Sequence, residues 1–173
     1  ENGVFKLYVY HKSLPKQWNY TKDLLTPGKW LVPIGKNHKG VLYHDFDKYA
    51  HFLIGGVPGF GKTILTKVMF LSLILNNPKD VNIYILDLKG GLEYSKFLGL
   101  PQVKAVASDI FEATEILINV VEKMKESERF FKANGYTNIT ETAIKERTFI
   151  FVDEGAELSP GIVGQDKKKL AQF

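Results

Sequence analysis

One stretch of eight residues limits, more than any other feature, what this chain can fold into. Residues 56–63 have the sequence GVPGFGKT, which fits the pattern G-x-x-x-x-G-K-[ST]. A loop that wraps around a phosphate group needs positive φ angles and must bring backbone N–H groups close to anionic oxygens. Glycine permits both, because it has no Cβ. The pattern predicts a phosphate-binding loop, and the structural alternative is a glycine-rich turn ahead of a buried helix.

The residues on either side of this stretch favour the phosphate-binding interpretation. The apolar run over 50–54 is typical of a buried strand, and residues 64–75 contain no Gly or Pro and are expected to form a helix. A strand, a glycine loop and a helix in this order aim the N-terminal dipole of the helix at the phosphates. We therefore expect this loop to bind a nucleotide.

Nucleotide binding by such a loop gives individual side chains roles. Lys62 is expected to reach the β- and γ-phosphates of ATP and so to assist catalysis, and the hydroxyl of Thr63 is expected to ligate Mg²⁺. Pro58 removes one N–H donor and stiffens the loop, while Phe60 is expected either to cover the nucleotide or to pack. The predicted nucleotide-binding residues are Gly56, Val57, Pro58, Gly59, Phe60, Gly61, Lys62 and Thr63.

A second motif lies near the end of the chain. Residues 148–154 have the sequence TFIFVDE, an apolar strand that ends in two adjacent carboxylates, as in a Walker B motif. Asp153 is expected to hold Mg²⁺ through its water shell, and Glu154 is expected to act as the base toward the water that attacks the γ-phosphate. The alternative is a buried strand that ends in two acidic residues at a solvated edge.

The rest of the pattern predicts an α/β fold. Apolar runs at 30–34 and 41–44 flank a glycine-bounded loop and predict a β-hairpin. Strands alternate with helices after it, which implies a mainly parallel central sheet with right-handed crossovers. Charges and glycines gather over 87–93, at a strand end of the kind where open α/β sheets bind ligands. Other expected elements are strands over 4–10, 81–86 and 103–106, and helices over 109–135 and 137–146.

The longer of these two helices is expected to pack in the core. Ser108 or Asp109 can cap its start, Glu112 is placed for a capping box, and Gly135 is a natural residue just past its end. Its apolar stripe at helical spacing comprises Ile116, Leu117, Val120, Val121 and Met124.

Composition excludes some kinds of site. The 173 residues contain no cysteine, which rules out disulfides and thiolate metal sites, and the four histidines have no metal-ligand spacing. The net charge is +4, with 12 lysines against 6 acidic residues over 1–89 and 11 basic against 13 acidic residues over 90–173. A basic first half is compatible with a polyanionic partner and equally with a solvated lysine-rich surface.

From about residue 30 to 154 the chain resembles the motor domain of the FtsK/SpoIIIE family of DNA-translocating ATPases, which includes relatives in conjugative plasmids and integrative elements. Residues 1–29 look more like the plasmid and conjugative members than the chromosome-segregation ones. The resemblance covers both nucleotide motifs, the hairpin before them and a middle segment, in the same order. The residues that carry it outside the nucleotide motifs are Ile34-Gly35-Lys36, Gly40-Val41, residues 51–56, Asp87-Leu88-Lys89, Glu93, Gly99-Leu100-Pro101, Val106, Asp109, Glu122-Lys123-Met124, Arg129 and residues 135–139.

The resemblance implies a RecA-like P-loop ATPase that moves DNA for plasmid or conjugative DNA transfer or segregation and assembles into a homo-hexamer. It implies that ATP and Mg²⁺ bind at the two motifs and that DNA is held through its phosphates. It divides the chain into a β/loop segment over 1–29 and an ATPase core over 30–173, whose C-terminal part, with the sensor residues and the arginine finger, is expected to be missing. The location implied is the cytoplasm, at the membrane face if an anchor or secretion machinery attaches elsewhere.

Two other functions remain open at this point. Type VII secretion ATPases resemble the same family, and their substrates are polypeptides, so a protein-export motor is the first alternative. The second is a module that binds nucleotide for assembly without turnover, which Glu154 argues against, because a scaffold needs no catalytic carboxylate.

Overall fold

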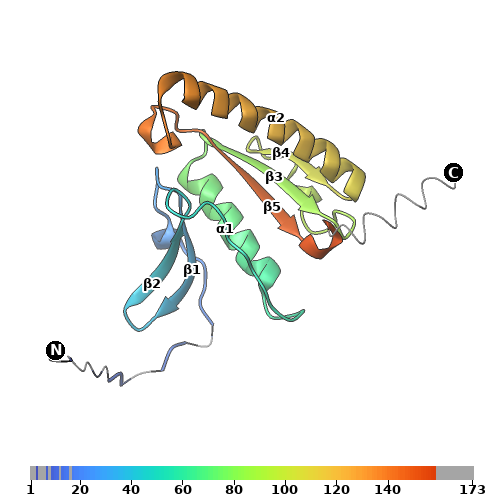
Figure 1. Ribbon diagram of the computed structural model, residues 1–173. Helices are drawn as coiled ribbons and strands as arrows, with labels where there is room; N and C mark the ends of the chain where they lie inside the picture. Colours follow the sequence, from blue (N-terminus) through green and yellow to red (C-terminus); the bar gives the residue numbers. More distant parts are fainter. Residues whose placement is uncertain (1–2, 4–6, 8, 12, 16, 159–173) are drawn as a thin grey trace. The chain divides into compact units, whose positions relative to one another are not determined.

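The computed structural model of the chain comprises two compact units, Glu1–Asn76 and Asn77–Phe173 (Figure 1). The strand predicted over 4–10 lies mostly outside the described residues, and the described positions Leu7, Val9 and Tyr10 are exposed and form no strand. The division of the chain at residue 29 stays a prediction. The residues that the structure describes are 3, 7, 9–11, 13–15 and 17–158.

The first unit contains the predicted β-hairpin. Strands β1 (Leu31–Asn37) and β2 (Gly40–Asp45) pair antiparallel, with a register shift between Pro33 and Gly35. The prediction is confirmed, but the strands extend through most of the expected glycine loop and leave a two-residue turn. The side chain of Asn37 makes this possible, because its Oδ1 accepts a hydrogen bond of 2.8 Å from the Lys39 N–H and so supports a tight turn.

Helix α1 (Lys62–Asn76) is the helix predicted after the glycine loop, and its last residue ties the unit together. The buried Asn76 amide accepts a hydrogen bond from the Thr26 N–H at 2.7 Å and donates to the Thr26 Oγ1 at 3.1 Å and to the Leu31 carbonyl at 2.9 Å. These contacts join the end of α1 to the start of β1 and to the loop after a short 3-10 turn, η1 (Lys22–Leu24).

The strand predicted over 50–54 is not formed, which corrects the sequence analysis. These residues lie in no strand, and Leu53 is 94% exposed. A strand exists only through hydrogen bonds to a neighbouring strand, and among the described residues no strand pairs with this run. Its apolar composition supplied the propensity for a strand but could not supply the partner.

The second unit is built on a three-stranded parallel sheet. Its strands are β3 (Val81–Asp87), β4 (Val103–Ala107) and β5 (Arg147–Asp153), in the spatial order β4-β3-β5. The central strand β3 is almost wholly buried, as expected for a strand with a neighbour on each side. This confirms the α/β class with a parallel sheet after a small hairpin.

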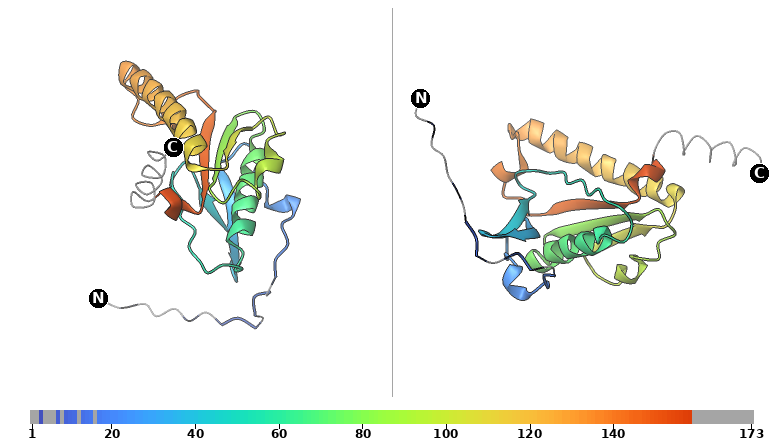
Figure 2. Two further views of the ribbon diagram at one scale, coloured as in Figure 1. Left: turned by 90° about the vertical axis from the view of Figure 1, so that its right-hand side faces the viewer. Right: turned by 90° about the horizontal axis from the view of Figure 1, so that it is seen from below.

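Helix α2 (Ile110–Asn134) runs alongside this sheet in both views of Figure 2. Asp109 is its N-cap, because its side chain accepts hydrogen bonds from the N–H groups of Phe111 and Glu112. Gly135 ends the helix in the left-handed conformation, with φ 71°. Glu112 reaches back to the N–H of Ser108, rather than to that of the cap residue, at 2.7 Å.

The predicted core stripe of α2 is only half correct. Ile116 and Leu117 pack against the buried cluster of Leu86, Ala107 and Ala113. Farther along the helix, Val121 and Met124 are exposed. Only the first part of α2 therefore uses its apolar face for packing within the described residues, and the stripe by itself did not reveal where that packing ends.

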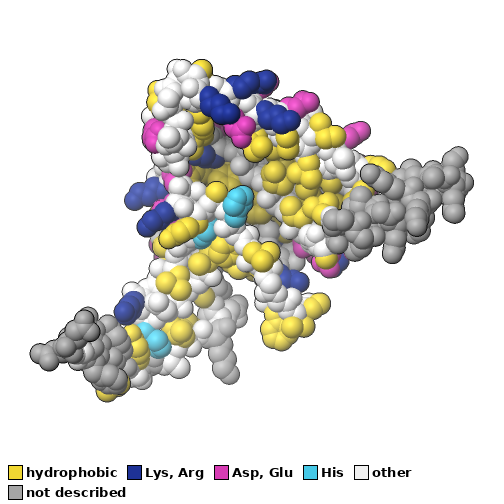
Figure 3. Space-filling view, viewed as in Figure 1, with side chains coloured by type: hydrophobic (Ala, Val, Ile, Leu, Met, Phe, Trp, Pro, Cys, Tyr) yellow, Lys and Arg dark blue, Asp and Glu magenta, His cyan; other side chains and the backbone are white. Residues whose placement is uncertain are grey.

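A hydrophobic surface follows α2 and the last strand of the sheet. In Figure 3 hydrophobic side chains gather over the region where α2 and β5 lie in Figure 1. Side chains of β5 alternate between half-buried and exposed, so one face of this strand is left open. Among the described residues no helix is long and apolar enough to cross a membrane. The exposed large hydrophobic residues of α2 and β5 are Phe111, Ile118, Val121, Met124, Phe130, Ile150 and Val152.

Short 3-10 turns complete the second unit. They are η2 (Ser95–Phe97), η3 (Ile139–Glu141) and η4 (Gly155–Leu158). The helix predicted over 137–146 is wrong, since only η3 forms there. The side chains of Asn138 and Glu141 bind the N–H groups of Thr140 and Thr137, and such local bonds favour a turn over a helix.

The Asn76 contacts predict a selective loss of stability. Asn76→Ala would leave the Thr26 N–H and the Leu31 carbonyl without this buried partner, and we expect it to cost about 1–3 kcal/mol. Chemical denaturation of the chain measures this. Asn134→Ala is the control, because Asn134 is an exposed asparagine at the end of the other helix. Equal effects of the two variants would show that the buried Asn76 contacts add no particular stability.

Candidate nucleotide-binding and catalytic site

The glycine loop has the backbone that the sequence predicted for a phosphate-binding loop. Gly59 and Gly61 have φ angles of 84° and 88°, a region that favours glycine. The loop turns through a hydrogen bond from the Phe60 N–H to the Val57 carbonyl at 3.3 Å, and α1 begins directly after it, at Lys62. The two glycines inside the loop are therefore required by its conformation.

The start of α1 is suited to an anion. No acidic residue lies in its first turn, so no acidic side chain there competes for the positive end of the helix dipole. The aliphatic part of Lys62 folds back toward Gly56, and a Cβ added to Gly56 would lie 3.6 Å from the Lys62 Cγ. Phe60 is 84% exposed, which contradicts the expectation that it packs and leaves the expectation that it covers a ligand.

In the second unit, the ends of two parallel strands bring acidic residues together. Asp87 at the end of β3 lies beside Asp153 at the end of β5 in the strand register. The Asp87 carboxylate is only 2% exposed and accepts a hydrogen bond of 3.1 Å from the Glu93 N–H. Asp87 thus anchors the turn that follows β3, whereas Asp153 is more open and stands at the strand tip, as predicted.

Glu154 has an uncommon backbone conformation. Its φ is 59°, and it is the one residue other than glycine with a positive φ among those that the structure describes. Its N–H donates to the Asp153 Oδ1 at 3.0 Å, and its carbonyl accepts from the Glu157 N–H at 2.9 Å. Such a conformation costs about 1–2 kcal/mol in an L-residue and is common at functional sites.

Lys89 contacts Glu154, although no chemical role was predicted for this lysine. The Lys89 Nζ lies 2.8 Å from the Glu154 Oε2. The hydrogen bond to Glu154 and the nearby charges of Glu154, Asp153 and Glu157 raise the pKa of Lys89, so it is an ammonium at neutral pH. The signal that could have revealed this pair is positional, because Lys89 and Glu154 each follow the end of a strand.

The turn that carries Lys89 is held by glycines. Gly90 and Gly91 have φ angles of 89° and 71°, and the Gly91 N–H donates to the Asp87 carbonyl at 3.1 Å. A Cβ on Gly91 would lie 3.0 Å from the Ser108 Cβ, which is closer than ordinary van der Waals contact, so Ser108 would have to move. The charges and glycines that the sequence shows over 87–93 therefore form an ordered turn at the edge of the sheet.

The predicted site residues fall into two groups. The loop residues 56–63 form one group in the first unit, and Asp153 and Glu154 form the other in the second unit, where Asp87 and Lys89 join them. Among the described residues no three acidic or histidine side chains gather in a way that could hold a metal ion by themselves. The roles given to these residues stay predictions.

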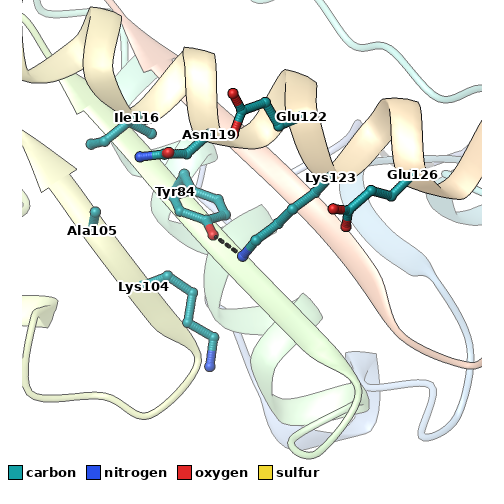
Figure 4. A pocket seen from close by; sticks show the side chains of 8 residues that line it. All are labelled: Tyr84, Lys104, Ala105, Ile116, Asn119, Glu122, Lys123 and Glu126. Atoms are coloured by element: carbon teal, nitrogen blue, oxygen red, sulfur yellow. Dashed lines mark hydrogen bonds between the residues drawn. The ribbon is translucent and has the colours of Figure 1, made fainter.

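A separate open cavity of about 480 Å³ lies between α2 and strands β3 and β4 (Figure 4). The Lys123 Nζ donates a hydrogen bond of 3.1 Å to the Tyr84 hydroxyl, and this bond raises the pKa of Lys123. Two acidic side chains, Glu122 and Glu126, line the cavity beside Lys123 and Lys104, so its charge is mixed. None of the predicted nucleotide or catalytic residues lines it.

Comparison with solved structures gives the fold a precedent. The structure of the pCW3 conjugation coupling protein TcpA, in a monomer form with ATPgS, matches with a TM-score of 0.73 and 22% sequence identity. The match covers 84% of this chain and 42% of that one. At this identity the likeness shows the fold alone, which is the predicted RecA-like P-loop α/β fold.

Sequence relatives point to one family. The chain is 31% identical over 114 residues to the DNA translocase FtsK of Sporosarcina ureae, a match that covers 64% of this chain and 14% of the relative. It is 32% identical over 137 residues to FtsK of Vibrio parahaemolyticus, covering 73% and 13%. The ESX-1 secretion system protein EccCa1 of Mycobacterium tuberculosis is 31% identical over 116 residues, covering 54% and 15%.

The chain thus spans less than a fifth of the length of these relatives. The sequence profile of the FtsK/SpoIIIE family matches residues 19–159, which include the glycine loop, α1, the parallel sheet and the acidic strand end. The resemblance seen in the sequence is therefore confirmed, and the chain belongs to the FtsK/SpoIIIE family.

Proposed function

We propose that this chain is the nucleotide-binding part of an ATP-driven motor that moves DNA, in the transfer of a plasmid or conjugative element. The observation that carries the proposal is that one FtsK/SpoIIIE chain contains both a phosphate-binding type of loop and a strand that ends in two carboxylates. A glycine loop with the φ angles of a phosphate cradle leads into α1, and two carboxylates follow strand β5. Phosphoryl transfer needs both kinds of group.

ATP binding would fall to the glycine loop. Backbone N–H groups over 56–61 and the start of α1 would surround the phosphates, except at Pro58, which has no N–H, and at Phe60, whose N–H donates to the Val57 carbonyl. Lys62 would place its ammonium on the β- and γ-phosphates. The exposed ring of Phe60 is free to lie over the nucleotide. The TcpA structure was solved with ATPgS, which supports a nucleotide as the ligand of this fold.

The residues present fit Mg²⁺. This ion prefers oxygen ligands, keeps several waters, and is held in ATPase sites by one or two protein groups together with the phosphates. The Thr63 hydroxyl and the Asp153 carboxylate are such groups, and a larger acidic cage is not needed. When bound, Mg²⁺ would neutralise charge on the phosphates, while Thr63 and Asp153 hold it.

Glu154 would act as the base. Its position directly after the strand tip, on a backbone held by the bonds to Asp153 and Glu157, places a carboxylate at the end of the sheet. A carboxylate can orient a water molecule and accept its proton as the oxygen attacks phosphorus. Glu154 is about one third exposed, which leaves it accessible to water.

DNA would be held mainly through its phosphates, by lysines rather than by groups that read bases. The first half of the chain has the lysine excess that such contact needs. As in the family, the full-length protein would work as a homo-hexameric ring in the cytoplasm, with any membrane or secretion-machinery attachment outside these residues.

Protein export is the second candidate, and one observation favours it. EccCa1, a secretion system protein, is as similar to this chain in percentage identity as the FtsK relatives are. If this chain belonged to such an export motor, the substrates of the full-length protein would be polypeptides. The response of ATP hydrolysis to DNA separates the two candidates.

The backbone of the glycine loop predicts which glycine tolerates a side chain. Gly61→Ala places a Cβ at φ 88°, which costs about 1–2 kcal/mol, so we expect ATP affinity to fall roughly tenfold. Gly55→Ala is the control, because Gly55 has no positive φ and nothing lies within 4 Å of its added Cβ. Equilibrium binding of ATP to the full-length protein measures both, and equal affinities would argue against the loop assignment.

The role of the base predicts a separation of binding from turnover. Glu154→Gln should lower the rate of ATP hydrolysis by about 10²–10⁴-fold while ATP still binds, because the amide cannot accept the proton. Glu157→Gln, three residues along in η4, is the matched control and should stay close to the wild-type rate.

Lys62→Ala should impair binding and hydrolysis together, and intact ATP affinity in that variant would contradict its assignment.

The DNA-motor proposal predicts salt-sensitive stimulation by DNA. Steady-state ATP hydrolysis by the full-length protein should rise with saturating single- or double-stranded DNA. At subsaturating DNA this stimulation should weaken steeply between about 50 mM and about 200 mM salt, because phosphate contacts release counterions. A rate of ATP hydrolysis that neither kind of DNA changes would contradict the DNA-motor proposal and favour the export motor.

A further inference from the structure

The ion pair between Lys89 and Glu154 is not used by the proposed reaction. The 2.8 Å contact occupies the Glu154 Oε2, and an oxygen that accepts a hydrogen bond from an ammonium is not available to a water molecule in the same direction. The contact also restricts the conformations of the Glu154 side chain. In the state described here, the carboxylate is therefore directed at Lys89.

The two residues differ in how firmly they are held. Glu154 sits on a backbone fixed by the Asp153 and Glu157 contacts, whereas the Lys89 side chain is 66% exposed on a flexible four-carbon stem. If the pair opens, the lysine is the partner that moves. The turn beneath it stays anchored, because Asp87 binds the N–H groups of Gly91 and Glu93 through its carbonyl and carboxylate.

We propose that Lys89 is a positioning residue that restrains Glu154 in the resting state, and that hydrolysis requires this pair to open. The proposal rests on the proposed role of Glu154 as the base. The anion that can take the ammonium from Glu154 is a phosphate group, since ATP and DNA both bring phosphates to such a protein and lysine binds phosphate as a point charge. Lys89 thereby holds hydrolysis below its unrestrained rate until a phosphate takes up its ammonium.

The test compares ATP hydrolysis by full-length variants without DNA. Lys89→Met keeps the length of the side chain and removes the charge, and Lys89→Gln is a second neutral variant. We expect kcat to rise about two- to fivefold in both, the range that an exposed ion pair can hold back, with KM for ATP unchanged. A gain in rate cannot come from misfolding.

Two controls show whether the gain is specific. Lys89→Arg should keep the low wild-type rate, since a guanidinium still pairs with a carboxylate. Lys96→Met removes another exposed lysine from the same connection between β3 and β4, and should leave the rate unchanged. In the double variant Lys89→Met with Glu154→Gln, the gain should vanish.

A second set of rate measurements, at saturating DNA, shows whether the phosphate that opens the pair belongs to DNA or to the nucleotide. If DNA phosphate opens the pair, wild type and Lys89→Met should reach the same rate with DNA. If the phosphate of bound ATP opens it, that phosphate opens the pair only in part and to the same extent with and without DNA, so the advantage of Lys89→Met should persist with DNA. Either result agrees with the restraint, provided that the DNA-free rate has risen.

Two results would overturn the inference. One is a DNA-free kcat of Lys89→Met and Lys89→Gln at or below that of wild type. The other is a gain that survives in the double variant. Failure of the proposed function is distinct from both, because it would show as full activity of Glu154→Gln alone or as no hydrolysis by the wild type.

Discussion

The parallel pairing of β3 with β5 is the constraint on which the acidic end of this site depends. The register runs without a shift from Val81 opposite Arg147 to Asp87 opposite Asp153. Because both strands point the same way, the residues that follow them meet at one edge of the sheet. A slip of one residue would turn the side chains of β5 to the opposite face and separate these groups. Hydrogen bonds in the sheet thereby decide which charges can touch.

Beyond the strand ends, unusual backbone angles keep the charged groups in place. Gly90 and Gly91 take positive φ angles without a steric cost, while Glu154 adopts one at a cost. A glycine at 154 would relax the backbone but would remove the carboxylate. The site keeps the strained acidic residue, and the neighbouring contacts from Asp153 and Glu157 supply part of the compensation. Conformation and chemistry are in conflict at this one position.

The N-termini of the two long helices differ in the charged groups that lie beside them. Asp109 and Glu112 neutralise the start of α2 with the chain's own carboxylates. The first turn of α1 has no acidic residue and follows glycines at positive φ. An anion from outside the chain would supply there what Asp109 supplies in α2. This contrast is visible in the sequence and explained by the structure.

Local patterns in the sequence indicated the hairpin, both long helices, the three strands of the parallel sheet and the glycine conformations of the loop, since propensity and periodicity are properties of neighbouring residues. Tertiary structure decided the rest. The apolar run over 50–54 lacks a strand partner, side-chain bonds around Asn138 favour η3 over a helix, and the second half of α2 leaves its stripe exposed. The contact of Lys89 with Glu154 joins residues 65 positions apart in the sequence, and only the register of two strands brings them within 2.8 Å.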